Sequence, residues 1–374
     1  MTLTVGIVTV HDIYNYGSVL QAFATQHMIS TLGYDVEIID YKYPNPRHVK
    51  GSRPRRIADY ILRVGNAVLK DALPGRPYTT YKERYQQFKT NHYRLSRRSY
   101  PTVDALMVNP PQYDIYVAGS DQIWRPEYIN DDPCFFLDFV RKGRRIAYAS
   151  SFGCLEIPPQ YHQTYRRYLS AFSHLGVREF AGQAIVKQLT GRDAAVVLDP
   201  TLLMTGEQWK PYAKPFAYDK PYIACYGLSV GDRYMEELAL HIAKLTGYKI
   251  VRINGKFHDY FARKMEYVLD AGPAEWMGIL ANASLILGQS FHAVAFSINF
   301  QRPFYTILQD SLDSQSRQTH ILRLLGLEHR AVHRHAPFPS AKDLELEVDF
   351  TQAIGRLDAE RVRSLDYMVS ALRG

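Results

Sequence analysis

Runs of β-branched and aliphatic residues alternate with helical stretches along most of the chain. A continuous apolar run at 5–10 predicts a strand buried on both faces, and a helix over 18–32 and a second strand over 35–41 are expected to follow it. Gly33 comes directly after the helix, where a glycine typically ends one. This strand–helix–strand unit predicts a parallel sheet, because parallel neighbours need a crossover helix.

The alternation continues into a second series of the same kind. The first series includes strands expected within 113–124, 144–153 and 174–179, helices over 160–172 and 180–189, and a closing segment at 194–203. The segment 205–221 is rich in Pro, Lys and aromatic residues and predicts a linker. Beyond it we expect strands at 222–228, 249–254, 284–288 and 303–308, helices at 232–246, 273–283 and 292–300, and a final helix at 357–374.

These two series predict an α/β protein of two Rossmann-like domains that face each other across a cleft. We expect an N-terminal domain over 1–205, a C-terminal domain over 206–350, and a C-terminal helix within 351–374 that packs back on the N-terminal domain. Ligands of such sheets bind beyond the carboxyl ends of the strands. A site is therefore expected in the loops that follow strands.

The net charge of +8 is concentrated in one segment. Residues 47–98 hold fourteen Lys and Arg against three Asp and Glu, so the rest of the chain is slightly acidic. An amphipathic basic helix is expected over 54–70. Such a basic face is usually solvated, and the alternative is attraction to anionic lipid head groups at the inner face of a membrane. No nucleic-acid recognition motif accompanies the charge.

Cysteine usage and the N-terminus bear on the compartment. The three cysteines are far apart and form no Cys-x-x-Cys pair, which argues against a disulfide framework or a zinc ribbon and fits a reducing compartment. The first residues predict a strand and not a signal peptide, and no apolar run approaches the ~18 residues that span a bilayer. We therefore expect a soluble, cytoplasmic protein. The His-rich stretch 328–335 lacks partners at metal-ligand spacing and predicts a surface loop.

Two interpretations fit the residues that open the first helix, Asn15, Gly17 and Ser18. A glycine there permits close approach of a ligand, and the free N–H groups of a helix start attract an anion. The alternative is an ordinary turn in which Ser18 caps the helix. The spacing matches neither a dinucleotide-binding fingerprint nor a Walker loop.

Ser120, Asp121, Gln122 and Trp124 follow the strand within 113–124. Three hydrogen-bonding side chains beside an indole suit a sugar, because the polar groups hold hydroxyls and the indole covers the ring. The same residue types serve as helix caps and core residues. Asp121 as a cap and Trp124 as a core residue therefore remain open.

Arg178 and His292 each sit at the end of a strand. Arg178 can bind a carboxylate or phosphate in bidentate fashion, or it can pair with the adjacent Glu179. His292 follows Gln289 and Ser290 at a helix start, where an imidazole can exchange protons at neutral pH. The alternative for His292 is a packed imidazole in the core.

Taken together, the motifs resemble those of the polysaccharide pyruvyl transferase family. The matching blocks occur in the family's order over roughly residues 3–330 and read NYGSVLQA, YDIYVAGSDQIW, RIAYASSFG, GVREFAG, VLDPTLL, GPAEWMGILANASLILGQSFHAVAFSINFQRPF and SRQTHILRLLGLEHR. The family pattern Thr-Asn/Asp-Ser-Phe-His-Gly is here Gly-Gln-Ser-Phe-His-Ala, so Gln289 and Ala293 depart from it.

This resemblance implies a glycosyltransferase-B-like fold and transfer of pyruvate from phosphoenolpyruvate to a sugar diol of a surface polysaccharide, such as a capsule, or of its lipid-linked precursor. It implies that His292 acts in catalysis and that Arg178 binds the donor. The residues themselves add the other expected groups. The donor side is expected to include Gln289, Ser290, Phe291 and Arg317, and Asp121 is expected to act as a catalytic or orienting group. The acceptor side is expected to include Asn15, Gly17, Ser18, Ser120, Gln122 and Trp124. No metal or other cofactor is expected.

Two other functions share parts of this pattern. A nucleotide-sugar glycosyltransferase would have the same fold, because fold alone does not define chemistry. A non-catalytic basic module that binds anionic membranes would use residues 47–98 and would not depend on His292. Ligand binding and phosphate release distinguish the three.

Overall fold

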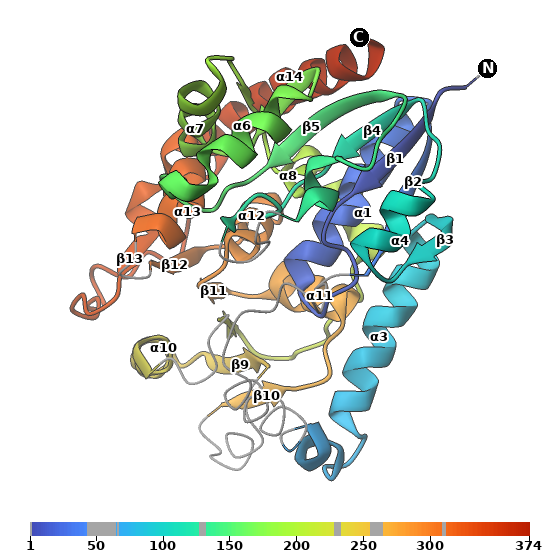
Figure 1. Cartoon of the computed structure of the whole chain (residues 1–374). Helices are drawn as coiled ribbons and strands as arrows, with labels where there is room; N and C mark the ends of the chain where they lie inside the picture. Colours follow the sequence, from blue (N-terminus) through green and yellow to red (C-terminus); the bar gives the residue numbers. More distant parts are fainter. Residues whose placement is uncertain are drawn as a thin grey trace.

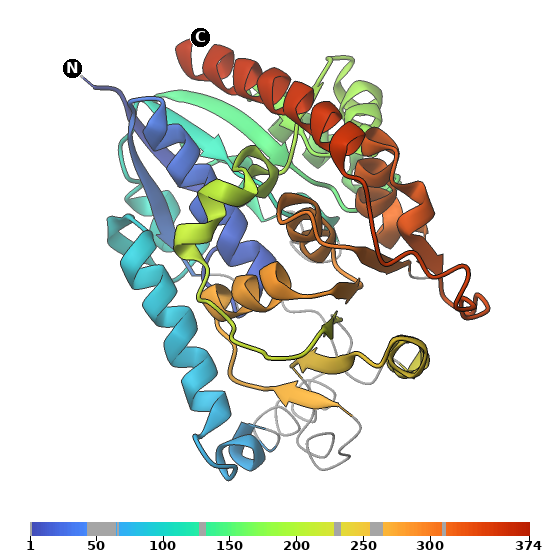
Figure 2. The same cartoon turned by 180° about the vertical axis from the view of Figure 1, so that it is seen from behind.

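The computed structural model consists of two α/β domains, one above the other in Figures 1 and 2. It describes residues 2–42, 65, 67–126, 132–227, 233–254, 265–308 and 312–374, with the side chains of 312–316 excepted. The helix expected over 54–70 falls mostly outside this part of the chain.

The N-terminal sheet has seven strands in the order β3-β2-β1-β4-β5-β6-β7, and every pair is parallel. This order is that of a Rossmann fold with one added strand. The strands are β1 (Thr4–Val8), β2 (Asp35–Tyr41), β3 (Leu95–Tyr100), β4 (Ile115–Ala118), β5 (Arg144–Ser150), β6 (His174–Val177) and β7 (Ala195–Val196).

The C-terminal sheet repeats this topology with six parallel strands in the order β10-β9-β8-β11-β12-β13. Its strands are β8 (Tyr222–Tyr226), β9 (Lys249–Ile253), β10 (Glu266–Val268), β11 (Leu285–Gly288), β12 (Phe304–Leu308) and β13 (Ala331–His333). The predicted fold class, two Rossmann-like α/β domains, is confirmed.

Helices cover both sheets. They are α1 (Tyr16–Thr31), α3 (Pro77–His92), α4 (Val103–Val108), α6 (His162–Ser170), α7 (Phe180–Thr190), α8 (Pro200–Leu203), α9 (Gly206–Trp209), α10 (Arg233–Thr246), α11 (Pro273–Asn282), α12 (Phe291–Asn299), α13 (Leu312–Leu325) and α14 (Thr351–Arg373). Short 3-10 turns lie at Pro133–Phe136, Pro159–Tyr161, Lys210–Tyr212 and Glu328–Arg330.

The helix α1 is buried on almost every side because it lies between its own sheet and the C-terminal domain. Tyr16, at its first residue, stacks on Trp276 of α11 with ring centroids 5.2 Å apart and donates a hydrogen bond to the carbonyl of Ala271. Burial in two domains explains why its sequence is apolar around most of its circumference. The N-terminus of α1 therefore points at the domain interface.

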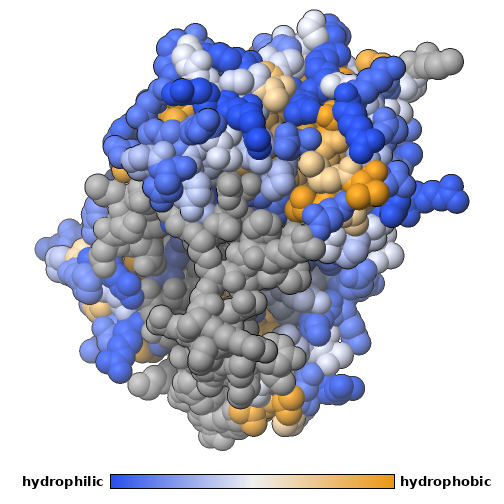
Figure 3. All heavy atoms as spheres, viewed as in Figure 1, coloured by the Kyte–Doolittle hydropathy of each residue, from blue (hydrophilic) through white to orange (hydrophobic). Residues whose placement is uncertain are grey.

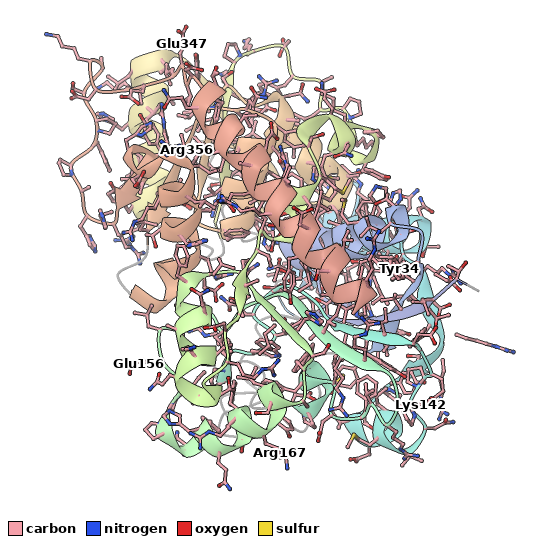
Figure 4. The ribbon with its side chains drawn as sticks, turned by 90° about the horizontal axis from the view of Figure 1, so that it is seen from above. Tyr34, Lys142, Glu156, Arg167, Glu347 and Arg356 are labelled. Atoms are coloured by element: carbon pink, nitrogen blue, oxygen red, sulfur yellow. The ribbon has the colours of Figure 1, made fainter. Side chains whose placement is uncertain are left out.

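The C-terminal helix α14 crosses from the C-terminal domain onto the N-terminal sheet. Seen from above, it runs from Arg356, near Glu347, toward the part of the N-terminal domain that carries Tyr34 (Figure 4). Tyr367 of α14 donates a hydrogen bond to the carbonyl of Ala147 in β5, at 2.9 Å. In the part of the chain that the structure describes, the polypeptide thus passes between the domains twice.

The described half of the basic segment 47–98 is built into the fold. In α3, Arg84 pairs with Asp270 of the C-terminal domain at 2.8 Å, and Lys89 pairs with Asp12 at 2.5 Å. These cations are therefore neutralised within the molecule. Where the face in Figure 3 is coloured it is mostly hydrophilic, with a hydrophobic area over the N-terminal domain. Within the described residues, no helix has the length and apolar character needed to cross a membrane.

Candidate active site

The two helices that begin at the domain interface, α1 and α12, bring their first turns together. Asn15 caps α1 and accepts a hydrogen bond from the backbone N–H of Ser18 at 3.1 Å. The expectation that Ser18 caps this helix is therefore wrong, because the helix begins two residues earlier. The Ser18 hydroxyl instead donates to Asp121 at 2.5 Å.

His292 lies in the first turn of α12 and reaches the N-terminal domain. Ser290 caps this helix by accepting from the backbone N–H of Ala293 at 3.0 Å. The imidazole is only 7% exposed and packs directly against Gly17. A Cβ atom on Gly17 would lie 1.9 Å from His292 Nδ1, so only glycine admits the ring. Gly17 does permit close approach, but what it contacts here is the catalytic candidate itself.

Asp199 is the centre of the polar network. Its Oδ2 accepts from Arg178 Nη1 at 2.6 Å and from the Ser120 hydroxyl at 2.9 Å, and lies 3.7 Å from His292 Nε2. Its Oδ1 accepts from the backbone N–H of Thr201 at 3.0 Å and from the Thr201 hydroxyl at 2.6 Å. Burial opposes ionisation of Asp199, but the charges of His292 and Arg178 and the hydrogen bond from Thr201 outweigh it and hold its pKa well below the ordinary value.

Arg178 presents an unused edge. The side chain is buried, its guanidinium lies over the ring of Phe291 with 4.8 Å to the centroid, and Nη1 is taken by Asp199. Among the residues that the structure describes, Nε and Nη2 have no hydrogen-bond partner, and Glu179 is 3.8 Å from Nε. These two N–H groups lie along one side of the guanidinium, the side that binds a carboxylate or phosphate in bidentate fashion. Left empty, each costs about 1–3 kcal/mol.

A second guanidinium, that of Arg317 in α13, lies in the same electrostatic environment. Burial, and then the charge of Arg178, lowers the pKa of Arg317 to about 10. The carboxamide of Gln122 lies against it, and with the amide oxygen turned toward Arg317 the distance to Nε is 3.2 Å. Two cations that disfavour each other are characteristic of a site that receives an anion.

Asp121 occupies a strained position between these groups. Its φ of 76° lies in the left-handed region, which is uncommon for a residue other than glycine. The carboxylate is half-buried and accepts from the Ser18 hydroxyl and from the backbone N–H of Gln122. Burial would raise the pKa of Asp121, but the charges of Arg178 and His292 and the Ser18 hydrogen bond hold it below the ordinary value. Asp121 is therefore ionised, and its carboxylate can accept a hydrogen bond from a hydroxyl group.

Trp124 does not join this group. It is fully buried, its indole stacks on Phe136 with centroids 5.6 Å apart, and its Nε1–H donates to the carbonyl of Phe135 at 3.0 Å. The core interpretation is the one that this burial supports, because no ring face is left for a sugar.

The remaining predicted donor residue, Gln289, follows β11. Its side-chain oxygen lies close to Gly227, where an added Cβ would be 2.5 Å away. Gln289 is buried, and its carbonyl accepts from Gln318 of α13 at 3.0 Å. It therefore ties the end of β11 to the helix that carries Arg317.

Asp199 is the site residue that the sequence reasoning missed. It lies in the quoted block VLDPTLL, where an Asp followed by Pro begins the short helix α8. That pattern, an N-cap with Pro at the first helical position just after a strand, would have placed Asp199 among the strand-end residues. Its contacts with residues far apart in the chain are not visible in any one motif.

The assembled geometry suits an anion bound next to proton-transfer groups. The carboxylates of Asp121, Glu179 and Asp199 offset the guanidinium charges, so the site offers an anion N–H groups rather than excess positive charge. Within the described ranges, His292 Nε2 also has no hydrogen-bond partner. In the described part of the chain, no three His, Cys, Asp or Glu side chains are grouped as metal ligands.

Comparisons with known proteins place this geometry in context. A family model described as polysaccharide pyruvyl transferase matches residues 15–311, a span that includes every site residue above except Arg317. None of the curated proteins compared with the chain matches it.

The chain is also similar in backbone to a number of solved structures at low sequence identity. The UDP-GlcNAc 2-epimerase of Methanocaldococcus jannaschii is 12% identical over 100% of this chain and 99% of that one, with a TM-score of 0.48. UGT89C1 of Arabidopsis thaliana is 12% identical over 99% of each chain, with a TM-score of 0.45. The E. coli heptosyltransferase WaaC is 12% identical over 96% and 99%, with a TM-score of 0.40.

Proposed function

The chain belongs to the polysaccharide pyruvyl transferase family, and from that premise we propose that it transfers pyruvate from phosphoenolpyruvate to two hydroxyls of a sugar. In this reaction, C2 of the enol forms bonds to both hydroxyl oxygens and its bond to the phosphate oxygen breaks. Both hydroxyls lose their protons. The methylene carbon gains one proton, and the departing phosphate carries the other. The products are a cyclic ketal and inorganic phosphate.

The observation that carries the proposal is the empty edge of Arg178. Phosphoenolpyruvate has a carboxylate and a phosphate, and either group matches two parallel N–H donors. Nε and Nη2 of Arg178 provide such a pair in a buried place, and Arg317 provides a second cation beside it. A dianion between the two guanidiniums would satisfy the unpaired N–H groups and relieve the repulsion between the cations.

His292 is proposed to deliver the proton to the methylene carbon. Within the described residues its Nε2 has no hydrogen-bond partner, and it lies 3.7 Å from the carboxylate of Asp199. An imidazole can deliver a proton as a general acid when it is placed within reach of the reacting carbon. Asp199 lies beside this imidazole and also orients Arg178, which it holds at 2.6 Å.

Asp121 is proposed to take a proton from an acceptor hydroxyl. Its carboxylate is ionised, half-buried and fixed by Ser18, whose hydroxyl occupies Oδ2 at 2.5 Å. A sugar hydroxyl that displaced the Ser18 hydroxyl would find a base already in position. The acceptor would then approach from the side of α1, and the donor from the side of Arg178.

The lipid-linked acceptor and contact with a membrane form the outer part of the proposal. In α3, Arg84 and Lys89 are engaged in ion pairs inside the molecule, whereas Lys82 is exposed. Attraction to anionic head groups would therefore depend on the exposed basic residues of 67–98 and on those of 47–64, which lie outside the described residues. Binding to vesicles that falls with added salt would support this role.

A thermal-shift screen with phosphoenolpyruvate and nucleotide sugars tests the donor. A ligand at 100 times its Kd stabilises the folded state by about 2.7 kcal/mol. We expect phosphoenolpyruvate to raise the Tm and nucleotide sugars to leave it unchanged. The reverse result would favour a nucleotide-sugar glycosyltransferase and reject the proposal.

Phosphate release in the presence of a diol-bearing glycan tests the reaction itself. His292→Ala should abolish release while keeping the phosphoenolpyruvate-induced shift in Tm, because the imidazole is proposed to act on the bound donor and not to hold its charge. Release that persists at the wild-type rate in His292→Ala would show that another group supplies the proton.

A further inference from the structure

A cavity of about 250 Å³ opens between α7, α13 and α14, next to the anion-binding groups. These three helices lie together on one side of the molecule in both ribbon views (Figures 1 and 2). Arg178 and Asp199 line one part of the cavity, and its walls include Leu202, Ile321 and Leu324. A charged end and aliphatic walls make the cavity amphipathic.

The cavity continues the proposed donor site along one face of α13. Arg317, His320, Ile321 and Leu324 are spaced at i, i+3, i+4 and i+7, which places them on the same side of a helix. Arg317 belongs to the anion site, and the other three line the cavity. A ligand held by the two guanidiniums would therefore have the cavity directly beside it.

The cavity itself does not suit the donor's charged groups. Burial first, and then the charges of Arg323 and Arg178, lower the pKa of His320 to about 4, so this wall residue is uncharged at neutral pH. At the exposed side, Arg363 is paired with Glu360. Away from Arg178, a carboxylate or phosphate among the aliphatic walls would lack partners. A donor whose charged groups are held at Arg178 would therefore turn its apolar part, the methylene carbon, toward the aliphatic walls.

One methylene carbon leaves most of this space unused. A cavity of about 250 Å³ is many times larger than the space that one water-sized group needs. A pocket made for the methylene group alone would be closed by the side chains at 321 and 324. Here Leu324 is only partly buried, and it lines the space instead of filling it.

We propose that this cavity is an alkyl subsite of the donor pocket, so that the protein also accepts enol phosphates of 2-oxo acids with a small alkyl group on the methylene carbon. The inference rests on the proposed function and extends its substrate class. The reaction with (Z)-2-phosphonooxy-2-butenoate is balanced as before: C3 gains one proton, two C–O bonds form at C2, and phosphate leaves. The product is the ketal of 2-oxobutanoate.

The test compares kcat/KM for phosphoenolpyruvate and for its methylated analogue by phosphate release. Wild type should use the two donors within about tenfold of each other. Leu324→Phe fills the cavity and should lower kcat/KM for the methylated donor by about 10- to 200-fold, which is the usual cost of a methyl group that does not fit. The kcat/KM for phosphoenolpyruvate should change little. Leu245→Phe makes the same substitution at an exposed leucine of α10 and serves as the control.

Three results would overturn the inference. Discrimination above about 200-fold against the methylated donor in wild type would mean that the cavity does not face the methylene carbon. An equal loss of both donors in folded Leu324→Phe would mean that phosphoenolpyruvate itself fills the cavity. Turnover of neither donor by wild type would reject the proposed function, and this inference with it. If Leu324→Phe does not fold, Val196→Ile adds one methyl group to the lining of the cavity and should give the same order of donors.

Discussion

Replacing Gly17 by alanine tests whether contact between the two helix starts sets the position of the catalytic candidate. The added methyl group would lie 1.9 Å from Nδ1, 2.4 Å from Cγ and 2.5 Å from Cε1 of His292. Ordinary van der Waals contact begins near 3.4 Å. The ring and the new Cβ must therefore separate by about 1.5 Å, either by rotation of the imidazole or by a small opening of the domains.

The effect on activity should exceed the effect on stability. Overpacking of this kind costs about 1–3 kcal/mol of folding free energy, which a chain of this size can absorb. A catalytic group displaced by about 1 Å loses on the order of 100-fold in rate. We therefore expect Gly17→Ala to fold, to lose about 100-fold in kcat for phosphate release, and to keep its affinity for phosphoenolpyruvate, because Arg178 is not moved.

The assay combines phosphate-release kinetics with chemical unfolding. Gly355→Ala is the matched control, because Gly355 lies in α14 with nothing within 4 Å of the added Cβ. It should gain about 0.5–1 kcal/mol of stability and keep full activity. Wild-type kcat in Gly17→Ala would refute the reasoning, since the ring would then not need its present position. A loss of activity that only follows unfolding would refute it as well.

Three further predictions concern other residues. Arg178→Lys removes the bidentate edge and should weaken phosphoenolpyruvate binding by about 10- to 100-fold in calorimetry, the worth of hydrogen bonds to a charged group; an unchanged Kd would move the donor elsewhere. Trp124→Phe should lower the free energy of unfolding by about 1–2 kcal/mol, through the lost hydrogen bond to Phe135, and should leave the KM for the acceptor glycan unchanged; a raised KM at normal stability would contradict the core assignment. The pKa of His320 falls from 6.5 in the unfolded chain to about 4 in the folded protein. Between these pH values only the unfolded chain binds the proton, so the free energy of unfolding should fall as the pH is lowered. His320→Gln should make the free energy of unfolding in urea depend less on pH, and an unchanged pH dependence would exclude His320 as its source.

Much of the framework could be predicted from the sequence because hydrophobic periodicity is a local signal. The strand at 35–41 agrees with β2 to the residue, and the helix at 180–189 agrees with α7 to within one. The helix α3 was not foreseen, because it buries only Pro77, Tyr85 and Phe88 and is otherwise polar. Its stability comes from contacts with both domains, which no local pattern records.

The sequence could predict which loops carry the site residues, but not the contacts that those residues make with one another. Arg178 and His292 could be chosen because each comes shortly after a strand, and both approach Asp199 in the structure. What joins them depends on how two domains face each other. Trp124 shows the opposite case, because an aromatic residue beside polar ones looks the same in sequence whether it faces a sugar or the core.

The double passage of the chain between the domains limits how they can move. One connection precedes β8, and the other lies between β13 and α14, whose Tyr367 is bound to β5. Any opening must bend both connections at once, which permits rotation about the line that joins them and resists sliding or twisting. The two halves would then separate and return along a single path, so that the imidazole of His292 comes back onto Gly17 in the same register after each release of product.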